Sequence, residues 1–290
     1  MKTIISLGFT ALLFFTSTTK AQNKNPDNDK SILWEVSGNG LSKPSYILGT
    51  FHALCSKDFE MKPKVLKALE NTNNLVLEIN YTDPAESVAM QKMMQSDRKI
   101  SDQLSSDEAK ELDKILINYA TTLKNIDSYS SQALYSLLAT KAIPCSMTDV
   151  KMHEVELIKN VMQHKKKVKG LEKVADQLST INKAFDLKNI IIQLKNGDEY
   201  AVYLQKVIET YKNEDLPALN NLMKDKRFMS KQQEELMVTR RNKNWAEKMP
   251  EIMKSENSFF AVGSAHLWGD EGLINLLKIK GYTVKPINSL

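Results

Sequence analysis

The sequence predicts an α+β fold in which a small central β-sheet is built from both ends of the chain, with a large helical insertion between them. Two observations support this prediction. Short apolar runs bounded by turn-forming residues lie near the two ends of the chain. The middle, about residues 84–256, is rich in Leu, Lys, Glu, Met and Gln, and its apolar residues recur at helical spacing. We expect residues 31–290 to form a single domain.

The first 21 residues have the pattern of a secretory signal peptide. Lys2 precedes an apolar stretch at residues 4–15, and small and polar residues then lead to Ala21. The apolar stretch is shorter than the roughly 20 residues of a membrane-spanning helix, so we prefer a signal cleaved near Ala21 to a membrane anchor. Residues 22–30 are expected to form a disordered lead-in. The mature protein should therefore be secreted or periplasmic, without a membrane span.

The expected elements follow one another in a simple order. Apolar runs predict strands at residues 32–36, 45–48 and 75–79 near the N-terminus and at 258–262 and 282–287 near the C-terminus, with a helix at 270–280. One further short strand, at 168–171, is expected to interrupt the helices of the middle region.

Charge and cysteine content restrict the function further. The chain has 40 Lys and Arg against 35 Asp and Glu, and the two signs alternate along the expected helices, which argues against nucleic-acid binding. The two cysteines, Cys55 and Cys145, form either one disulfide, as is common in exported proteins, or two buried thiols. No heptad or exposed apolar stripe predicts an oligomer.

Two of the four histidines occupy the same place in a repeated pattern. Gly49 precedes His52, and Gly263 precedes His266, each by three positions and each after an apolar run. A glycine at a strand end lets the backbone turn closely, so that the imidazole can point back over the sheet. One such histidine is usually an ordinary loop residue, but two copies favour a shared site. Neutral imidazoles are common ligands of divalent metals.

Glu78 is the best candidate for a third member of this site. It interrupts the apolar run at 75–79, and a buried carboxylate needs a metal or a basic partner, whereas an outward-facing one does not. Two histidines and a carboxylate form a hydrolytic metal set that leaves positions for water and substrate. His153 and Glu154 begin like a zinc-protease motif, but Leu157 stands where the second histidine is required, so we set this pair aside.

Four stretches of the sequence together resemble the TraB/GumN family, which includes PrgY-type pheromone-shutdown proteins and TIKI proteases. They are YILGTFH, LVLEIN, RRNKNWAEKM and FFAVGSAHLWGDEGLINLLKIKGYTVKPI. The last stretch is the most specific, and the resemblance covers nearly the whole mature chain.

The resemblance implies a metal-dependent hydrolase with His52, Glu78 and His266 at its site and a divalent ion (Mn, Co or Zn) as cofactor. It also implies roles for an Arg-Asn pair, here Arg241 and Asn242, and for a Gly-Leu-Glu followed by a Gln, here 170–172 and 177.

Each of these residues has an expected role. Glu78 should bind the ion or act as general base, and Arg241 should hold a substrate carboxylate or an oxyanion. Arg240 is expected on the surface. Asn242 should orient Arg241 or contact substrate, and Trp268 should wall the cleft or pack on the following helix.

The sequence therefore predicts an exported metal-dependent hydrolase, and most specifically a peptidase that acts on peptides or proteins outside the cytoplasm. The alternative is a protein that sequesters a peptide or another ligand without cleaving it, as the pheromone-shutdown members of the family suggest.

Overall fold

The computed structural model describes residues 30–288. The predicted signal peptide (residues 1–21) and all but the last residue of the expected lead-in lie outside the described residues. Within residues 30–288, no helix combines the length and the apolar character needed to cross a membrane.

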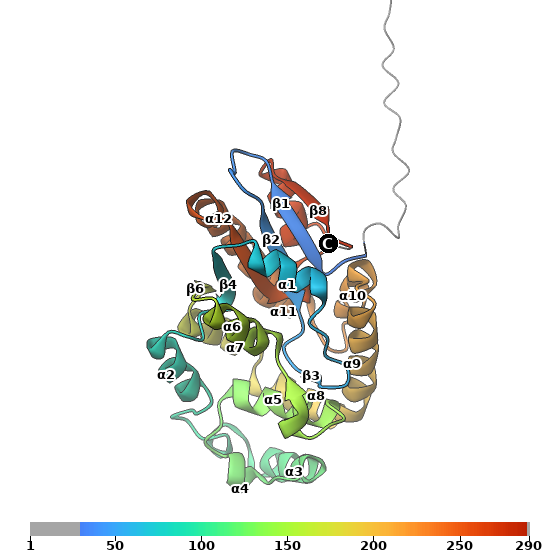
Figure 1. Ribbon diagram of the computed structural model, residues 1–290. Helices are drawn as coiled ribbons and strands as arrows, with labels where there is room; N and C mark the ends of the chain where they lie inside the picture. Colours follow the sequence, from blue (N-terminus) through green and yellow to red (C-terminus); the bar gives the residue numbers. More distant parts are fainter. Residues whose placement is uncertain (1–29, 289–290) are drawn as a thin grey trace, which may run out of the picture.

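A six-stranded mixed sheet forms the centre of the molecule (Figure 1). Its strand order is β6-β4-β7-β2-β1-β8, with these bounds: β1 Leu33–Ser37, β2 Ser45–Thr50, β4 Asn74–Ile79, β6 Lys167–Glu172, β7 Ser258–Gly263 and β8 Thr283–Pro286. The four strands from β6 to β2 run parallel, and β1 and β8 are antiparallel to their neighbours. Strands β2, β4 and β7 are buried along their whole length, which explains why their sequences are nearly continuous apolar runs.

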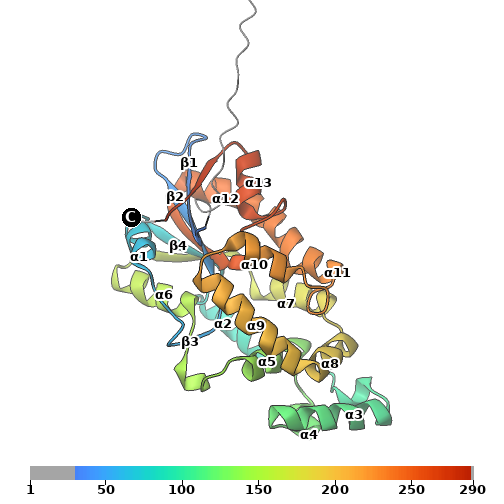
Figure 2. The same cartoon turned by 90° about the vertical axis from the view of Figure 1, so that its right-hand side faces the viewer.

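Helices cover both faces of this sheet. Figure 2 shows α1 (Pro63–Glu70) and α6 (His153–Gln163) on one side, and α12 (Arg240–Ser255) and α13 (Leu273–Ile279) on the other. The amphipathic α12 buries Trp245 and Met249 against the strands. The prediction of an α+β fold with a sheet drawn from both chain ends is confirmed.

The middle of the chain is helical, as predicted, but it also supplies the edge strand β6, which is longer than the expected strand at 168–171. Besides α6 and α12, its helices are α2 Pro84–Met93, α3 Ser106–Leu116, α4 Leu123–Ile126, α5 Ser131–Ala142, α7 Val174–Ala184, α8 Leu187–Lys195, α9 Gly197–Lys212, α10 Leu216–Met223 and α11 Lys231–Glu234. Part of this region has an apolar cluster of its own, centred on Leu112, Leu134 and Ile190. Figure 1 shows α3 and α4 at the end of the molecule farthest from β1 and β8.

A disulfide fastens the chain that follows β2 to the helical middle. Cys55 is bonded to Cys145, and their Cα atoms are 5.9 Å apart, which decides between the two cysteine states left open by the sequence. Next to this bond, the short strands β3 (Leu54–Cys55) and β5 (Val150–Lys151) pair with each other. The segment after β2 is therefore fixed to the segment that leads into α6.

Candidate active site

The carboxyl ends of three parallel strands lie at one edge of the sheet. Thr50, the last residue of β2, is opposite Gly263, the last residue of β7, and β4 pairs along the other side of β7. Because parallel strands point the same way, His52, Glu78 and His266 are all delivered to this edge, where open α/β sheets bind their ligands.

These three side chains meet over Gly263. Its backbone N–H donates to Glu78 Oε1 at 2.8 Å. A methyl group in place of its missing side chain would lie 3.4 Å from Glu78 Oε1, 3.5 Å from His52 Nε2 and 3.5 Å from the His266 ring. The space above Gly263 is therefore bounded by two imidazoles and one carboxylate.

Glu78 is buried and paired with Arg241, whose Nη2 donates to Glu78 Oε2 at 2.5 Å. Burial alone would raise the pKa of Glu78, but the charge of Arg241, helped by the two imidazoles and the Gly263 N–H, lowers it to about 2. At neutral pH this carboxyl is therefore ionised and a weak base.

Arg241 uses all five of its N–H groups within the described structure. It donates through Nε to Glu172 at 3.1 Å, through Nη1 to the Met237 carbonyl at 3.0 Å and to His266 Nε2 at 3.2 Å, and through Nη2 to Glu78 and Glu172. The expected contact with a substrate carboxylate or oxyanion therefore has no free donor here. Arg241 instead holds Glu78, Glu172 and His266 in place.

A local change of helix type precedes Arg241. Between α11 and α12 the chain makes a π-helical turn, Glu235–Thr239, of the kind often found at functional sites. Arg241 is 7% exposed, whereas its neighbour Arg240 is exposed and forms an ion pair with Glu235, as expected for a surface arginine.

His266 is buried, and its pKa is lowered to about 3. Burial is the main cause, and the positive charge of Arg241 adds to it. Asn242 Oδ1 lies 2.7 Å from Nδ1, so the proton is on Nδ1 and Nε2 accepts from Arg241. Asn242 also donates to the carbonyls of His266 and Glu271, so it orients His266 rather than Arg241.

His52 has the opposite environment. Its side chain is 59% exposed, and its Nδ1 lies 2.9 Å from Glu154 Oε1, which also accepts from Thr50 Oγ1 at 2.8 Å. Loss of water around the ring would lower the pKa of His52, but the hydrogen bond and charge of Glu154 outweigh this effect and raise it to about 9.

Glu154 and His153 belong to the site, although the sequence argument set them aside. Glu154 is 4% exposed, and its Oε2 has no hydrogen-bond partner within residues 30–288. His153 Nδ1 donates to the Phe51 carbonyl at 2.9 Å, so both residues fasten the loop that carries His52. A usable sequence signal was Cys145, because a bond from Cys55 to it brings the start of α6 close to His52.

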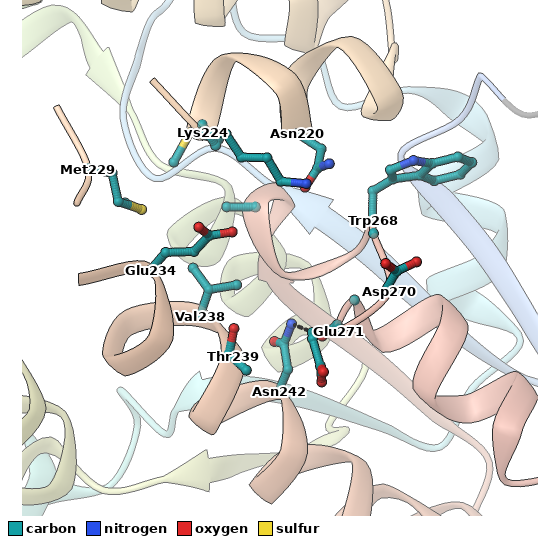
Figure 3. Close-up of a pocket in the computed structure, with 14 residues that line it drawn as sticks. Asn220, Lys224, Met229, Glu234, Val238, Thr239, Asn242, Trp268, Asp270 and Glu271 are labelled. Atoms are coloured by element: carbon teal, nitrogen blue, oxygen red, sulfur yellow. Dashed lines mark hydrogen bonds between the residues drawn. The ribbon is translucent and has the colours of Figure 1, made fainter. Parts of the chain in front are cut away.

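Trp268 lies apart from the meeting point over Gly263. Its ring packs against Trp34, with ring centres 6.0 Å apart, and it lines a separate cavity together with Asn242 and Ala265. Figure 3 shows this cavity, including the bond from Asn242 to Glu271. The ring contact of Trp268 is with Trp34 of β1, so the expected packing on the following helix stays a prediction.

The residues over Gly263 have the donor atoms that bind divalent ions, but they do not form a complete coordination shell. Imidazole nitrogen and carboxylate oxygen suit Zn, Mn and Co, and the gap above Gly263 is bounded by such atoms. Within residues 30–288, however, no three His, Cys, Asp or Glu side chains are grouped tightly enough to coordinate an ion, and Arg241 donates to both His266 Nε2 and Glu78 Oε2. His52 Nε2 and Glu78 Oε1 are the donors most open to an ion.

Comparison with known proteins gives one family and one distant relative. The model of the TraB/PrgY/gumN family matches residues 32–286. Metalloprotease TIKI2 of Xenopus tropicalis is 21% identical over 320 residues, which cover 90% of this chain but 61% of the length of that relative. No solved structure matches the chain.

Proposed function

The chain belongs to the TraB/PrgY/gumN family, and from this premise we propose that it is an exported metal-dependent hydrolase that cleaves peptides or proteins. The observation that carries the proposal is the meeting of His52, Glu78 and His266 over Gly263. The name of the distant relative, a metalloprotease, supports the reaction class.

In this proposal His52 Nε2 and Glu78 Oε1 would hold a divalent ion, and His266 would complete the set through Nε2, which in this structure accepts from Arg241. Such an ion polarises a carbonyl group and lowers the pKa of bound water towards neutrality. The chain's own groups prepare this site. Glu154 accepts the Nδ1 proton of His52, and such carboxylate partners raise the basicity of metal-binding histidines. At neutral pH the metal-free ring is also protonated on Nε2, so an ion would bind there by displacing that proton. The low pKa of His266 keeps its imidazole neutral, which is the state that binds metals.

Export is part of the proposal. Two features support it: the signal-like pattern at residues 1–21 and the bond between Cys55 and Cys145, because disulfides persist in oxidising compartments. Mass spectrometry of the protein secreted by its host should give a mature N-terminus near Gln22.

A peptide-library assay on protein of known metal content tests the activity. Cleavage should stop with a chelator, return with Mn, Co or Zn, and be lost in His52→Ala and Glu78→Ala. His164→Ala is the matched control, because His164 is an exposed histidine that follows the last residue of α6, at the end of this helix opposite to His153. If the metal-loaded protein binds peptides but cleaves none, and His52→Ala binds them equally well, the protein is a sequestering protein instead.

A further inference from the structure

A cleft of about 350 Å³ opens directly in front of His52, Arg241 and His266. Its walls come from the helical middle of the chain. The side chains that define this apolar cleft include Tyr135, Ala139, Tyr203, Leu204, Met223 and Val238. The volume is at the lower end of the range for ligand pockets, which suits one or two large side chains.

The charged and basic side chains of the apolar cleft all lie at the end where the candidate site is. Among the described residues that line it, none is Asp, Glu or Lys, and the charged or basic groups are His52, Arg241 and His266. A charged substrate group placed among the helices would lose its water without gaining a partner, which is costly. An apolar group would lose nothing of this kind.

The tyrosines of the lining add little polar character, because their hydroxyl groups lie against other groups of the protein. Tyr203 donates to the Leu222 carbonyl at 3.0 Å, and its ring stacks on Phe228 with centres 4.4 Å apart. The hydroxyl groups of Tyr135 and Tyr200 lie near each other, and burial raises the pKa of both. The tyrosines therefore offer ring surface to an occupant.

The cavity next to the apolar cleft has charged side chains in its lining, unlike the helical walls of the cleft itself. The cavity in Figure 3 shares Met223, Met229 and Val238 with the apolar cleft, but its other walls include Lys224 and Glu234. Met223 and Met229 thus separate two spaces, and of these two only the one that contains His52 has walls without Asp, Glu or Lys among the described residues. Methionine side chains are flexible and adapt to different apolar shapes.

We propose that the apolar cleft binds a large aliphatic or aromatic side chain of a peptide substrate, next to the bond that the site cleaves. This inference rests on the proposed function for the cleavage, and on the cleft alone for the binding. The side chain should be selected as a class, with a preference for Phe or Leu over Asp or Lys of about tenfold to a hundredfold in kcat/KM.

The test uses a peptide series with one varied position and two cleft variants. Ala139→Phe fills the cleft from α5, so kcat/KM for the Phe peptide should fall at least tenfold while that for the Ala peptide is kept. Leu204→Glu places a carboxylate in the wall, so the Lys peptide should gain over the Phe peptide. The matched control is Ala85→Phe, since Ala85 is exposed on α2 and is not part of the cleft lining.

Calorimetric binding of the same peptides to chelator-treated protein separates this inference from the proposed function. Tighter binding of Phe and Leu peptides, weakened by Ala139→Phe, supports the cleft even if no peptide is cleaved, in which case only the hydrolase proposal fails. Cleavage without any preference for apolar side chains would contradict the proposed role of the cleft in substrate binding. A preference that both variants leave unchanged would contradict it too. Either result is compatible with the hydrolase proposal. Equal binding of Phe and Asp peptides by the wild type also contradicts the proposed role of the cleft.

Discussion

The two Gly-x-x-His segments have the same sequence pattern and opposite environments. His266 sits in a buried turn after β7, beside Arg241, with its pKa lowered to about 3. His52 lies in an exposed loop after β2, beside Glu154, with its pKa raised to about 9. The pattern brings each imidazole to the edge of the sheet, and burial together with the charged partner then decides whether the ring takes up a second proton.

The difference teaches that a repeated motif does not imply equivalent roles. One histidine is held neutral in a closed network of Arg241 and Asn242. The other is held by a single carboxylate and faces the cleft. Substitutions of these partners should change one histidine and spare the other.

Arg241→Ala should have the largest effect on stability. It leaves Glu78 and Glu172 buried without their cation, and breaking a buried ion pair in this way costs about 3–5 kcal/mol. Arg240→Ala, one residue earlier, removes an exposed pair with Glu235 and should cost less than about 1 kcal/mol. Urea unfolding of both variants gives the comparison, and equal losses would show that Arg241 does not hold the site together.

Alanine substitutions of Gly263 and Gly49 should affect activity and stability separately. Gly263 has φ −52° and ψ 136°, which alanine adopts easily, but the added methyl group would enter the space between the three side chains. Gly263→Ala should therefore fold with unchanged or slightly greater stability and lose activity by about 100-fold.

Gly49→Ala should instead reduce the stability of the fold. Its methyl group would press on Leu267 and Ser264 at 3.1 Å, so the variant should lose about 1–3 kcal/mol through overpacking. Circular dichroism melts beside a peptidase assay test both variants. A stable and fully active Gly263→Ala protein would mean that the gap above Gly263 has no function.

Glu154→Gln should act on His52 alone. The amide oxygen can still accept from Nδ1, but the negative charge is gone, so the pKa of His52 should fall from about 9 to near its ordinary value of about 6.5. Activity should fall about tenfold, as for other partners of metal-binding histidines. NMR titration of the imidazole protons in metal-free protein measures this, and the His266 signals should not move.

The smallest expected effect is a loss of stability at alkaline pH. The folded pKa of His52 lies above its unfolded value, so its contribution is fully present below about pH 6.5. That contribution is lost as the pH rises through about 9. Urea midpoints of metal-free protein should fall slightly over this range, and Glu154→Gln should abolish the fall. An identical decline in both proteins would assign it to other groups.

The sequence predicts the strands well because buried parallel strands must be continuous apolar runs. The same logic identifies His52, Glu78 and His266, whose positions follow from where those strands end. Glu154 escapes such reasoning, since its role depends on how α6 packs beside the chain after β2, and this contact joins residues about one hundred positions apart. The role of Arg241 depends likewise on four hydrogen-bond partners that only the folded chain assembles.

The place of β7 in the sheet has a consequence for how the protein folds. This strand lies between β2 and β4, yet it comes more than 170 residues after them in the chain. Contacts of such long separation form slowly, and until β7 arrives the facing edges of β2 and β4 have no neighbour. Exposed strand edges can pair with other chains. We therefore expect the kinetics of β7 insertion to govern how much protein reaches the native state and how much aggregates.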